Sequence, residues 1–424
     1  MSETLLFRIL LASFTASCFG NKVSTNGLKL NGISTNNGIY TAGMRATRHF
    51  QLMALLAIAG CIRAPITSIG PQITAISKGQ NLGIVQFGFL TAIPVICFAV
   101  AAPLPSLRIF RRIKTEQLVV FALLALAAAT ILRTLGSNSL LFGSTIILGI
   151  SIAILNIVTP ALVRRDYPKK ITTVMPIYSA VLALMASLGA GLSIPIASYF
   201  GDNWKIGISV WAIPAILVAL IWIPLLRKAK PMPDTHENHF KELFRSKKAW
   251  LVSIYMGVQS AIFYTQVAWM PKILIDKGYS AAEAGALFGL STLCGFALTL
   301  ILPLVFSRGE DLKLAILATS IPGIVGFLLL NHLSNSWTIP ALLLISTTHA
   351  ALPLALGLIA MKSPSVGATS HLSSMAQGIG YCIAAIFPVL IGYTYEASNS
   401  WLIATYLIAA LILAQSIIGI KANR

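Results

Sequence analysis

Acidic residues are scarce in this sequence, and none of them interrupts a long apolar run. The 424 residues include 12 aspartates and glutamates against 31 lysines and arginines, and charged residues make up only 10% of the chain. All the acidic residues lie between the apolar runs, at their ends or in terminal segments. A carrier that exports apolar cations is expected to hold an acidic group in its cavity, so this absence counts against multidrug export.

Motifs of membrane enzymes and pumps are also absent. The sequence contains no HExxH, no GxSxG, no GxxxxGK[ST] and no pair of aspartates inside an apolar run. A membrane protease, an esterase or a nucleotide-driven pump needs these groups, so we expect the chain not to be an enzyme. The five cysteines form no CxxC pair. We therefore expect no disulfide, no metal site and no cofactor.

Long apolar runs dominate what the sequence does contain. Hydrophobic residues make up 56% of the chain, and the mean hydropathy of +0.82 is typical of a protein embedded in the lipid bilayer. A helix needs about 20 apolar residues to cross the hydrocarbon. The sequence therefore predicts an all-α membrane protein with twelve transmembrane helices, near residues 50–76, 82–103, 117–135, 139–163, 172–199, 205–226, 250–270, 283–306, 312–331, 337–361, 371–395 and 400–420.

The longest polar stretch between these runs divides the chain into two halves. We expect an N-terminal six-helix bundle at 44–226, a cytoplasmic central loop at 227–249 and a C-terminal six-helix bundle at 250–424. Residues 1–43 do not fit this plan, because their apolar stretch is short and a tract of Asn, Ser, Thr and Gly follows it. We expect this extension to be disordered, or translation to start at Met44.

Lysines and arginines are distributed unevenly across the predicted loops. The side of the termini and the central loop carries 22 of them, and the opposite loops carry five: Lys78, Arg133, Lys205, Lys272 and Lys277. Basic loops face the cytoplasm, so we expect both termini there. The basic residues lie in short loops rather than on one face, and we therefore expect no nucleic-acid partner.

The two halves resemble each other at corresponding places. Pro71 and Pro271 each follow an apolar run, a polar turn comes next, and Gly88 and Gly285 lie near the start of the following run. We expect both prolines to end or kink their helices. Weak internal symmetry is typical of transporters built from repeats, whose binding site lies near the bilayer midplane between the halves.

Arg63 stands inside the first apolar run with no acidic residue near it. A charge at this depth costs at least about 2.5–3.5 kcal/mol, which some interaction must offset. In one interpretation Arg63 lines a cavity and binds an anionic or strongly polar substrate, while Pro65 kinks the helix. In the other, its side chain reaches the membrane surface or bonds helix carbonyls. We favour the first, because Thr67 and Ser68 follow on nearby faces.

Polar side chains inside other runs are further candidates for the substrate site. Gln377 and Tyr381 share one helix face, where hydrogen bonds to a neighbouring helix are as plausible as ligand contacts. His349 and His371 are candidates for a proton site, and His349 also for substrate contact, although a lone buried histidine is more often structural. The remaining candidates for substrate contact are Asn156, Tyr178, Gln259 and Tyr264.

Several stretches together resemble one family of transporters. These are "RAPITSIGP", "FLTAIPVICFAVAAPL", "LNIVTPALVRRDYP" and "LSSMAQGIGYCIAAIFPVLIGYTYE", and they resemble the cyanate and 2-nitroimidazole transporters of the major facilitator superfamily over about residues 48–420. The resemblance implies two pseudo-symmetric six-helix bundles in the inner (plasma) membrane of a bacterium. Arg63 matches the family's Arg-Pro element, with Ala64 intervening here. Gln377 and Tyr381 match its Ala-Gln…Gly-Tyr element, with Ser374 in place of the usual glycine.

The sequence therefore predicts a secondary active transporter of a small anionic or polar solute, cyanate- or nitroimidazole-like, that works by alternating access. An anion is driven out of an inside-negative compartment by about 2.3 kcal/mol per 100 mV, so uptake needs a coupling proton or a counter-anion. We expect a monomer in the lipid bilayer. One alternative is a multidrug or toxic-compound efflux carrier. The other is a non-transporting membrane sensor or assembly subunit, which would need a soluble output domain, and the central loop is too short to be one.

Overall fold

The computed structural model describes residues 50–104, 113–229, 240–306, 312–363 and 366–424. The described residues form helices joined by short turns, with no strand among them, so the expected all-α fold is confirmed. The extension expected at 1–43 and residues 230–239 of the expected central loop lie outside the described residues.

The N-terminal half begins with a broken span. Residues 50–62 are helical, Arg63 interrupts the helix, and α3 (Ala64–Thr67) completes the span. A turn at 68–72 leads into the short helix α4 (Ile73–Gln80). The remaining helices of this half are α5 (Ile84–Ala101), α7 (Thr115–Leu132), α8 (Asn138–Asp166), α9 (Ile171–Tyr199), α10 (Trp204–Ser209) and α11 (Ala212–Trp222).

One span of the C-terminal half changes its helix type midway. Its tenth expected span consists of α16 (Thr338–Ser346), the 3-10 segment η5 (Thr347–Ala350) and α17 (Ala351–Met361). The other helices of this half are α12 (Phe240–Arg245), α13 (Lys247–Asp276), α14 (Ala281–Phe306), α15 (Lys313–His332), α18 (Val366–Ser398) and α19 (Trp401–Asn423).

Eleven spans among the described residues are long and apolar enough to cross a membrane. The helix at the seventh expected position, α13, has 30 residues but is not one of the eleven. It carries polar side chains such as Gln259, Tyr264 and Gln266, and these are buried by neighbouring helices. Its lower hydropathy follows from a place inside the protein, where it meets other helices rather than lipid.

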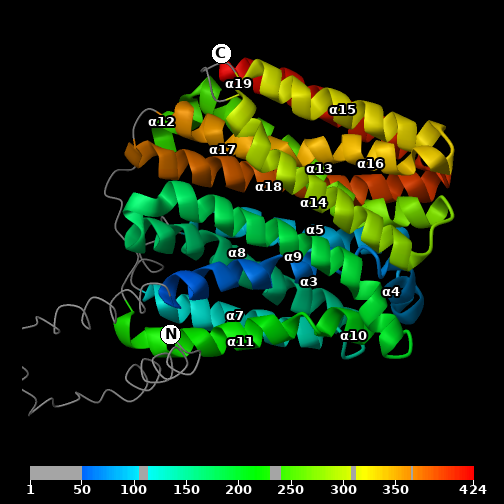
Figure 1. Ribbon diagram of the computed structural model, residues 1–424, viewed down its shortest axis with the longest axis horizontal. Coiled ribbons are helices and arrows are strands. Elements are labelled where there is room, and N and C mark those ends of the chain that lie inside the picture. Colours follow the sequence, from blue (N-terminus) through cyan, green and yellow to red (C-terminus); the bar gives the residue numbers. More distant parts are fainter. Residues whose placement is uncertain (1–49, 105–112, 230–239, 307–311, 364–365) are drawn as a thin grey trace, which may run out of the picture.

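The two halves lie side by side with their helices running in roughly the same direction. In Figure 1 the N-terminal half, blue to green, lies below the C-terminal half, whose helices run from green through yellow to red. The halves meet where α5 packs against α18 and α9 packs against α14. We call the end that holds α12 and the end of α19 the terminus side, and the end that holds α4 and α10 the loop side (Figure 1).

Close contacts between the halves gather on the loop side. A Cβ added to Gly88 would lie 2.9 Å from the Pro388 oxygen, and one added to Gly285 would lie 2.7 Å from the Ala190 oxygen. The hydroxyl of Ser187 in α9 donates to the carbonyl of Gly289 in α14 at 2.7 Å. Glycine lets two helix backbones approach this closely because it has no side chain. The halves are therefore in tight contact at this end.

Pro271 does not end its helix, so that part of the expectation was wrong, while a kink at Pro271 stays a prediction. The helix α13 runs through Pro271 to Asp276. A proline inside a helix cannot donate a hydrogen bond to the carbonyl four residues earlier, which here belongs to Val267. A membrane helix can continue past this missing bond where neighbouring helices pack against it. Gly70 packs against this carbonyl, since a Cβ on Gly70 would lie 2.5 Å from its oxygen. Pro71 lies in the turn at 68–72.

Candidate functional site

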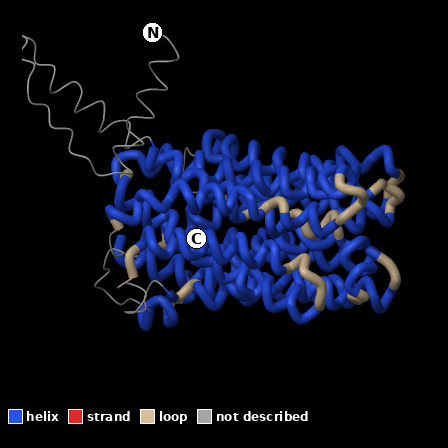
Figure 2. Tube along the Cα trace, turned by 90° about the horizontal axis from the view of Figure 1, so that it is seen from below, coloured by secondary structure: helices blue, strands red, loops and turns tan. Residues whose placement is uncertain are grey.

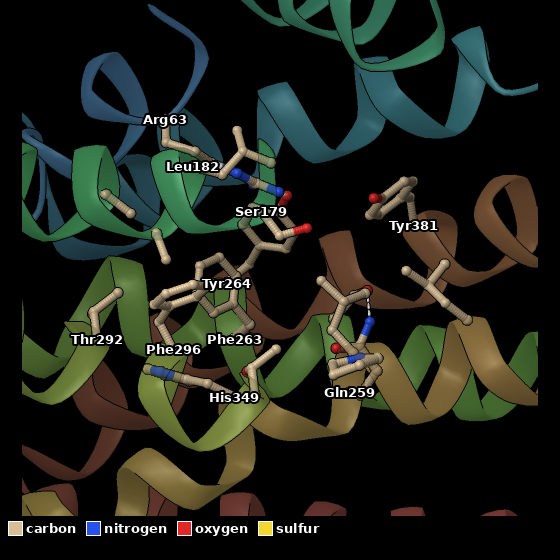
Figure 3. A pocket seen from close by; sticks show the side chains of 17 residues that line it. Arg63, Ser179, Leu182, Gln259, Phe263, Tyr264, Thr292, Phe296, His349 and Tyr381 are labelled. Carbon is tan, nitrogen blue, oxygen red and sulfur yellow. Dashed lines mark hydrogen bonds between the residues drawn. The ribbon is translucent and has the colours of Figure 1, made fainter. Parts of the chain in front are cut away.

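A cavity of about 160 Å³ lies between the two halves, near the break in the first span. Figure 3 shows side chains from both halves pointing into it. Arg63 and part of α9 form one wall, and α13, α14, α17, η5 and α18 form the rest. None of the 17 described residues that line it is acidic. This volume suits a small solute, because it lies below the range of sites for drug-sized ligands.

Arg63 reaches this cavity from the break in its helix. Its Nη1 donates to the hydroxyl of Tyr264 at 3.0 Å, and its guanidinium carbon lies 5.8 Å from the centre of the Phe263 ring. No carboxylate among the described residues contacts Arg63, and its two partners on α13 are neutral. Arg63 is half-buried. The guanidinium therefore retains donors that a ligand in the cavity can use.

Aromatic rings of both halves pack around Tyr264, the hydrogen-bond partner of Arg63. Tyr381 of α18 lies edge-on to Phe98 of α5, with ring centres 5.5 Å apart, and 6.3 Å from the Tyr264 ring. Phe263 lies edge-on to Tyr264 at 5.2 Å. Rings in such arrangements are rigid and exclude water, which strengthens any charge interaction beside them.

His349 forms the far wall of the cavity and comes from the 3-10 segment η5. Its Nε2 lies 3.1 Å from the Gln266 side-chain oxygen, while the Gln266 nitrogen donates to Thr348 at 3.0 Å. Which of the two ring nitrogens carries the hydrogen depends on the tautomer, so either Nε2 or Nδ1 can be the donor. This Nδ1 is buried without a hydrogen-bond partner among the described residues. Gly295 leaves room for it, because a Cβ there would lie 2.4 Å from Nδ1.

The structure brings together five of the nine residues that the sequence suggested for substrate contact. Arg63, Gln259, Tyr264, His349 and Tyr381 all line the cavity (Figure 3). They come from the first, seventh, tenth and eleventh expected spans. Residues that are distant in sequence therefore meet around one space, which is the arrangement that a substrate site between two halves requires.

The other four suggested residues do not line the cavity. Thr67 donates to the carbonyl of Ala186 at 2.8 Å and so holds α3 to α9. Gln377 donates to Ser373 within its own helix at 2.9 Å. Tyr178 is buried in α9, and Asn156 is half-buried in α8. His371 is buried near the start of α18 and is also outside the cavity lining.

Sequence reasoning missed several lining residues. Ser179 lies next to the suggested Tyr178, and Phe263 next to the suggested Tyr264. On α14, Thr292, Phe296 and Thr299 also line the cavity, and their spacing of four and three residues places them on one helix face. The sequence feature that could have indicated this face is the pair of threonines, Thr292 and Thr299, seven residues apart in an apolar span.

Comparison with known proteins agrees with this architecture. Residues 55–388 match the Major Facilitator Superfamily. The chain is 31% identical to the 2-nitroimidazole transporter of Escherichia coli (strain K12) over 378 residues, covering 88% of this chain and 95% of that protein. It is 31% identical over 379 residues to the uncharacterized transporter YycB of Bacillus subtilis (strain 168), covering 88% of this chain and 93% of that protein. It is 27% identical to the cyanate transport protein CynX of Escherichia coli (strain K12), covering 83% of this chain and 91% of that protein.

Solved structures share the fold. A bacterial homologue of the human lysosomal transporter Spinster, in an inward-facing and unoccupied conformation, superposes with a TM-score of 0.72 at 17% identity, covering 89% of this chain and 97% of that chain. The D-xylose–proton symporter gives a TM-score of 0.66 at 14% identity, covering 89% of this chain and 96% of that chain. The protein is a multi-pass membrane transporter rather than an enzyme, and it belongs to the major facilitator superfamily.

Proposed function

We propose that this transporter is a secondary carrier for a small anionic or polar solute of the cyanate or nitroimidazole kind. The observation that carries the proposal is the single guanidinium of Arg63 in a small cavity whose described lining holds no acidic residue. A planar set of N–H donors among aromatic rings suits a small planar anion or a nitro group, which present acceptor oxygens or nitrogens. An exporter of cations is disfavoured because the cavity offers no carboxylate to bind them.

We propose that the carrier works by alternating access in the inner membrane, with both termini in the cytoplasm. The count of basic residues supports this orientation. The close contacts between the halves lie on the loop side, which in this orientation is the side away from the cytoplasm. One chain supplies both walls of the cavity, which supports a monomeric carrier.

The proposed function is tested by counterflow in proteoliposomes. Purified protein is reconstituted, and entry of labelled cyanate or labelled 2-nitroimidazole is measured against an excess of unlabelled solute inside. We expect entry of at least one of the two above that of protein-free vesicles, and competition by other small anions. Failure to move either solute, by protein whose folding is confirmed, would reject this substrate class.

We further propose that His349 is the site of the coupling proton. It is the histidine among the described residues of the cavity wall, and its side-chain partner Gln266 is neutral. Protonation there would place a second positive charge in the same cavity as Arg63, which favours binding of an anion together with a proton.

Replacing His349 by glutamine is expected to separate accumulation from exchange. Accumulation driven by an imposed proton gradient should fall at least tenfold, because glutamine cannot be protonated, while counterflow should stay within about threefold of the wild type. His371→Gln is the matched control, since His371 lies outside the cavity lining. Gradient-driven accumulation that survives His349→Gln would show that the proton binds elsewhere.

A further inference from the structure

A second arginine lies in the membrane region, at the loop-side end of α7. Arg133 follows the last residue of that helix and is only 2% exposed. By sequence it was counted with the loop residues, at the end of the expected span 117–135, whereas the structure buries it. No carboxylate of the described residues pairs with Arg133. A buried guanidinium without a carboxylate is costly, so its remaining contacts indicate what it does.

The contact that Arg133 makes is with the broken part of the first span. Its Nη1 donates to the carbonyl of Pro65 at 2.9 Å. In a continuous helix the Pro65 carbonyl would accept a hydrogen bond from the N–H of Ile69. Residues 68–72 form a turn instead, in which the N–H of Ser68 donates to the carbonyl of Ala64 and the N–H of Gln72 donates to the carbonyl of Ile69. Arg133 therefore supplies the donor that the interrupted helix lacks.

Pro65 is two residues from Arg63, so the two arginines act on one segment. Thr67 and Gln72 tie the same segment to α9, through the carbonyls of Ala186 and Ser193. Those two bonds are between neutral groups, whereas the bond from Arg133 is assisted by its charge and is the stronger kind. Arg133 is absent from the cavity lining. Arg133 therefore does not touch a solute in the cavity, and its link to the site runs through the segment that carries Arg63.

We propose that Arg133 is a positioning residue: by binding the Pro65 carbonyl, it holds the broken first span so that the guanidinium of Arg63 points into the cavity. This inference rests on the proposed function, in which Arg63 binds the solute. It predicts that loss of Arg133 weakens solute binding without removing any group that touches the solute.

The first test needs no solute. Hydrogen–deuterium exchange is measured on the full chain for a peptide covering residues 64–72, in the wild type, Arg133→Met and Thr134→Val. Thr134 is the matched control, because it is buried beside Arg133 and its hydroxyl bonds only the Ile131 carbonyl of its own helix end. We expect exchange in this peptide to rise at least tenfold in Arg133→Met alone. Unchanged exchange would overturn the proposal, whether or not any solute is transported.

The second test uses counterflow of labelled 2-nitroimidazole or cyanate, whichever the wild type moves. We expect Arg133→Met to raise the half-saturation concentration about tenfold with a maximal rate within twofold of the wild type, and Arg133→Lys to restore it to within about threefold. In an Arg63→Lys background, Arg133→Met should add little, because a positioning residue acts through the group that it positions. Fully additive losses, or a fall in maximal rate alone, would contradict the positioning role. A wild type that moves neither probe counts against the proposed function and leaves the exchange measurement to decide on Arg133.

Discussion

Replacement of Arg63 by alanine is expected to reduce transport at least about thirtyfold at solute concentrations below saturation. Removing one partner of a buried, hydrogen-bonded charge pair costs about 2–5 kcal/mol, and each 1.4 kcal/mol corresponds to about a factor of ten in affinity. The cavity lining offers no second arginine or lysine to take over. Arg63→Lys retains the charge but loses the planar set of donors, so we expect a loss of about tenfold. Counterflow in proteoliposomes measures both variants.

Lys78→Ala is the control for this series. Lys78 is basic like Arg63, but it lies exposed in α4 on the loop side. Its replacement should leave transport within about twofold of the wild type. Thermal unfolding in detergent checks that Arg63→Ala is folded, which is expected because it removes a charge that is costly to bury. Equal transport by the wild type, Arg63→Ala and Arg63→Lys would remove Arg63 from the site.

The double variant Gly285→Ala and Gly289→Ala is expected to shift the carrier away from the conformation seen here. The added Cβ atoms would lie 2.7 Å from the Ala190 oxygen and 2.8 Å from the Ser187 oxygen. Both oxygens belong to the backbone of α9, so the two helices must separate at the loop side. A carrier that cannot close this end cannot complete its cycle, and we expect transport to fall at least tenfold.

Distance measurements test the shift directly. Spin labels at the exposed positions 199 and 283, near the loop-side ends of α9 and α14, should show a longer mean distance in the double variant. Gly143→Ala with Gly357→Ala is the matched control, because a Cβ at either place meets no atom within 4 Å. Both pairs add two methyl groups to helices, so a loss of transport in the control as well would show that close packing of α9 and α14 is not the cause.

The candidate site was only partly accessible from sequence. Arg63 and Tyr264 were identified because a charge or a polar ring stands out in an apolar run. Adjacent residues were not distinguished: Tyr178 was named, whereas its neighbour Ser179 lines the cavity. In a soluble helix the polar face marks the surface, but in a membrane helix the lipid-facing side and the packed side are both apolar, so periodicity does not reveal which face meets the cavity.

The sequence by itself determined the helical class, the number of expected spans and the family. Hydrocarbon accepts only segments that satisfy their own backbone hydrogen bonds, so apolar runs of sufficient length must become helices. The tertiary structure alone decided what each polar side chain does. It placed Arg63 and His349 on opposite walls of one cavity, left Thr67 as a link between helices, and buried Arg133 against the Pro65 carbonyl. These roles depend on which helix lies opposite each side chain, and that is fixed by packing between segments far apart in the chain.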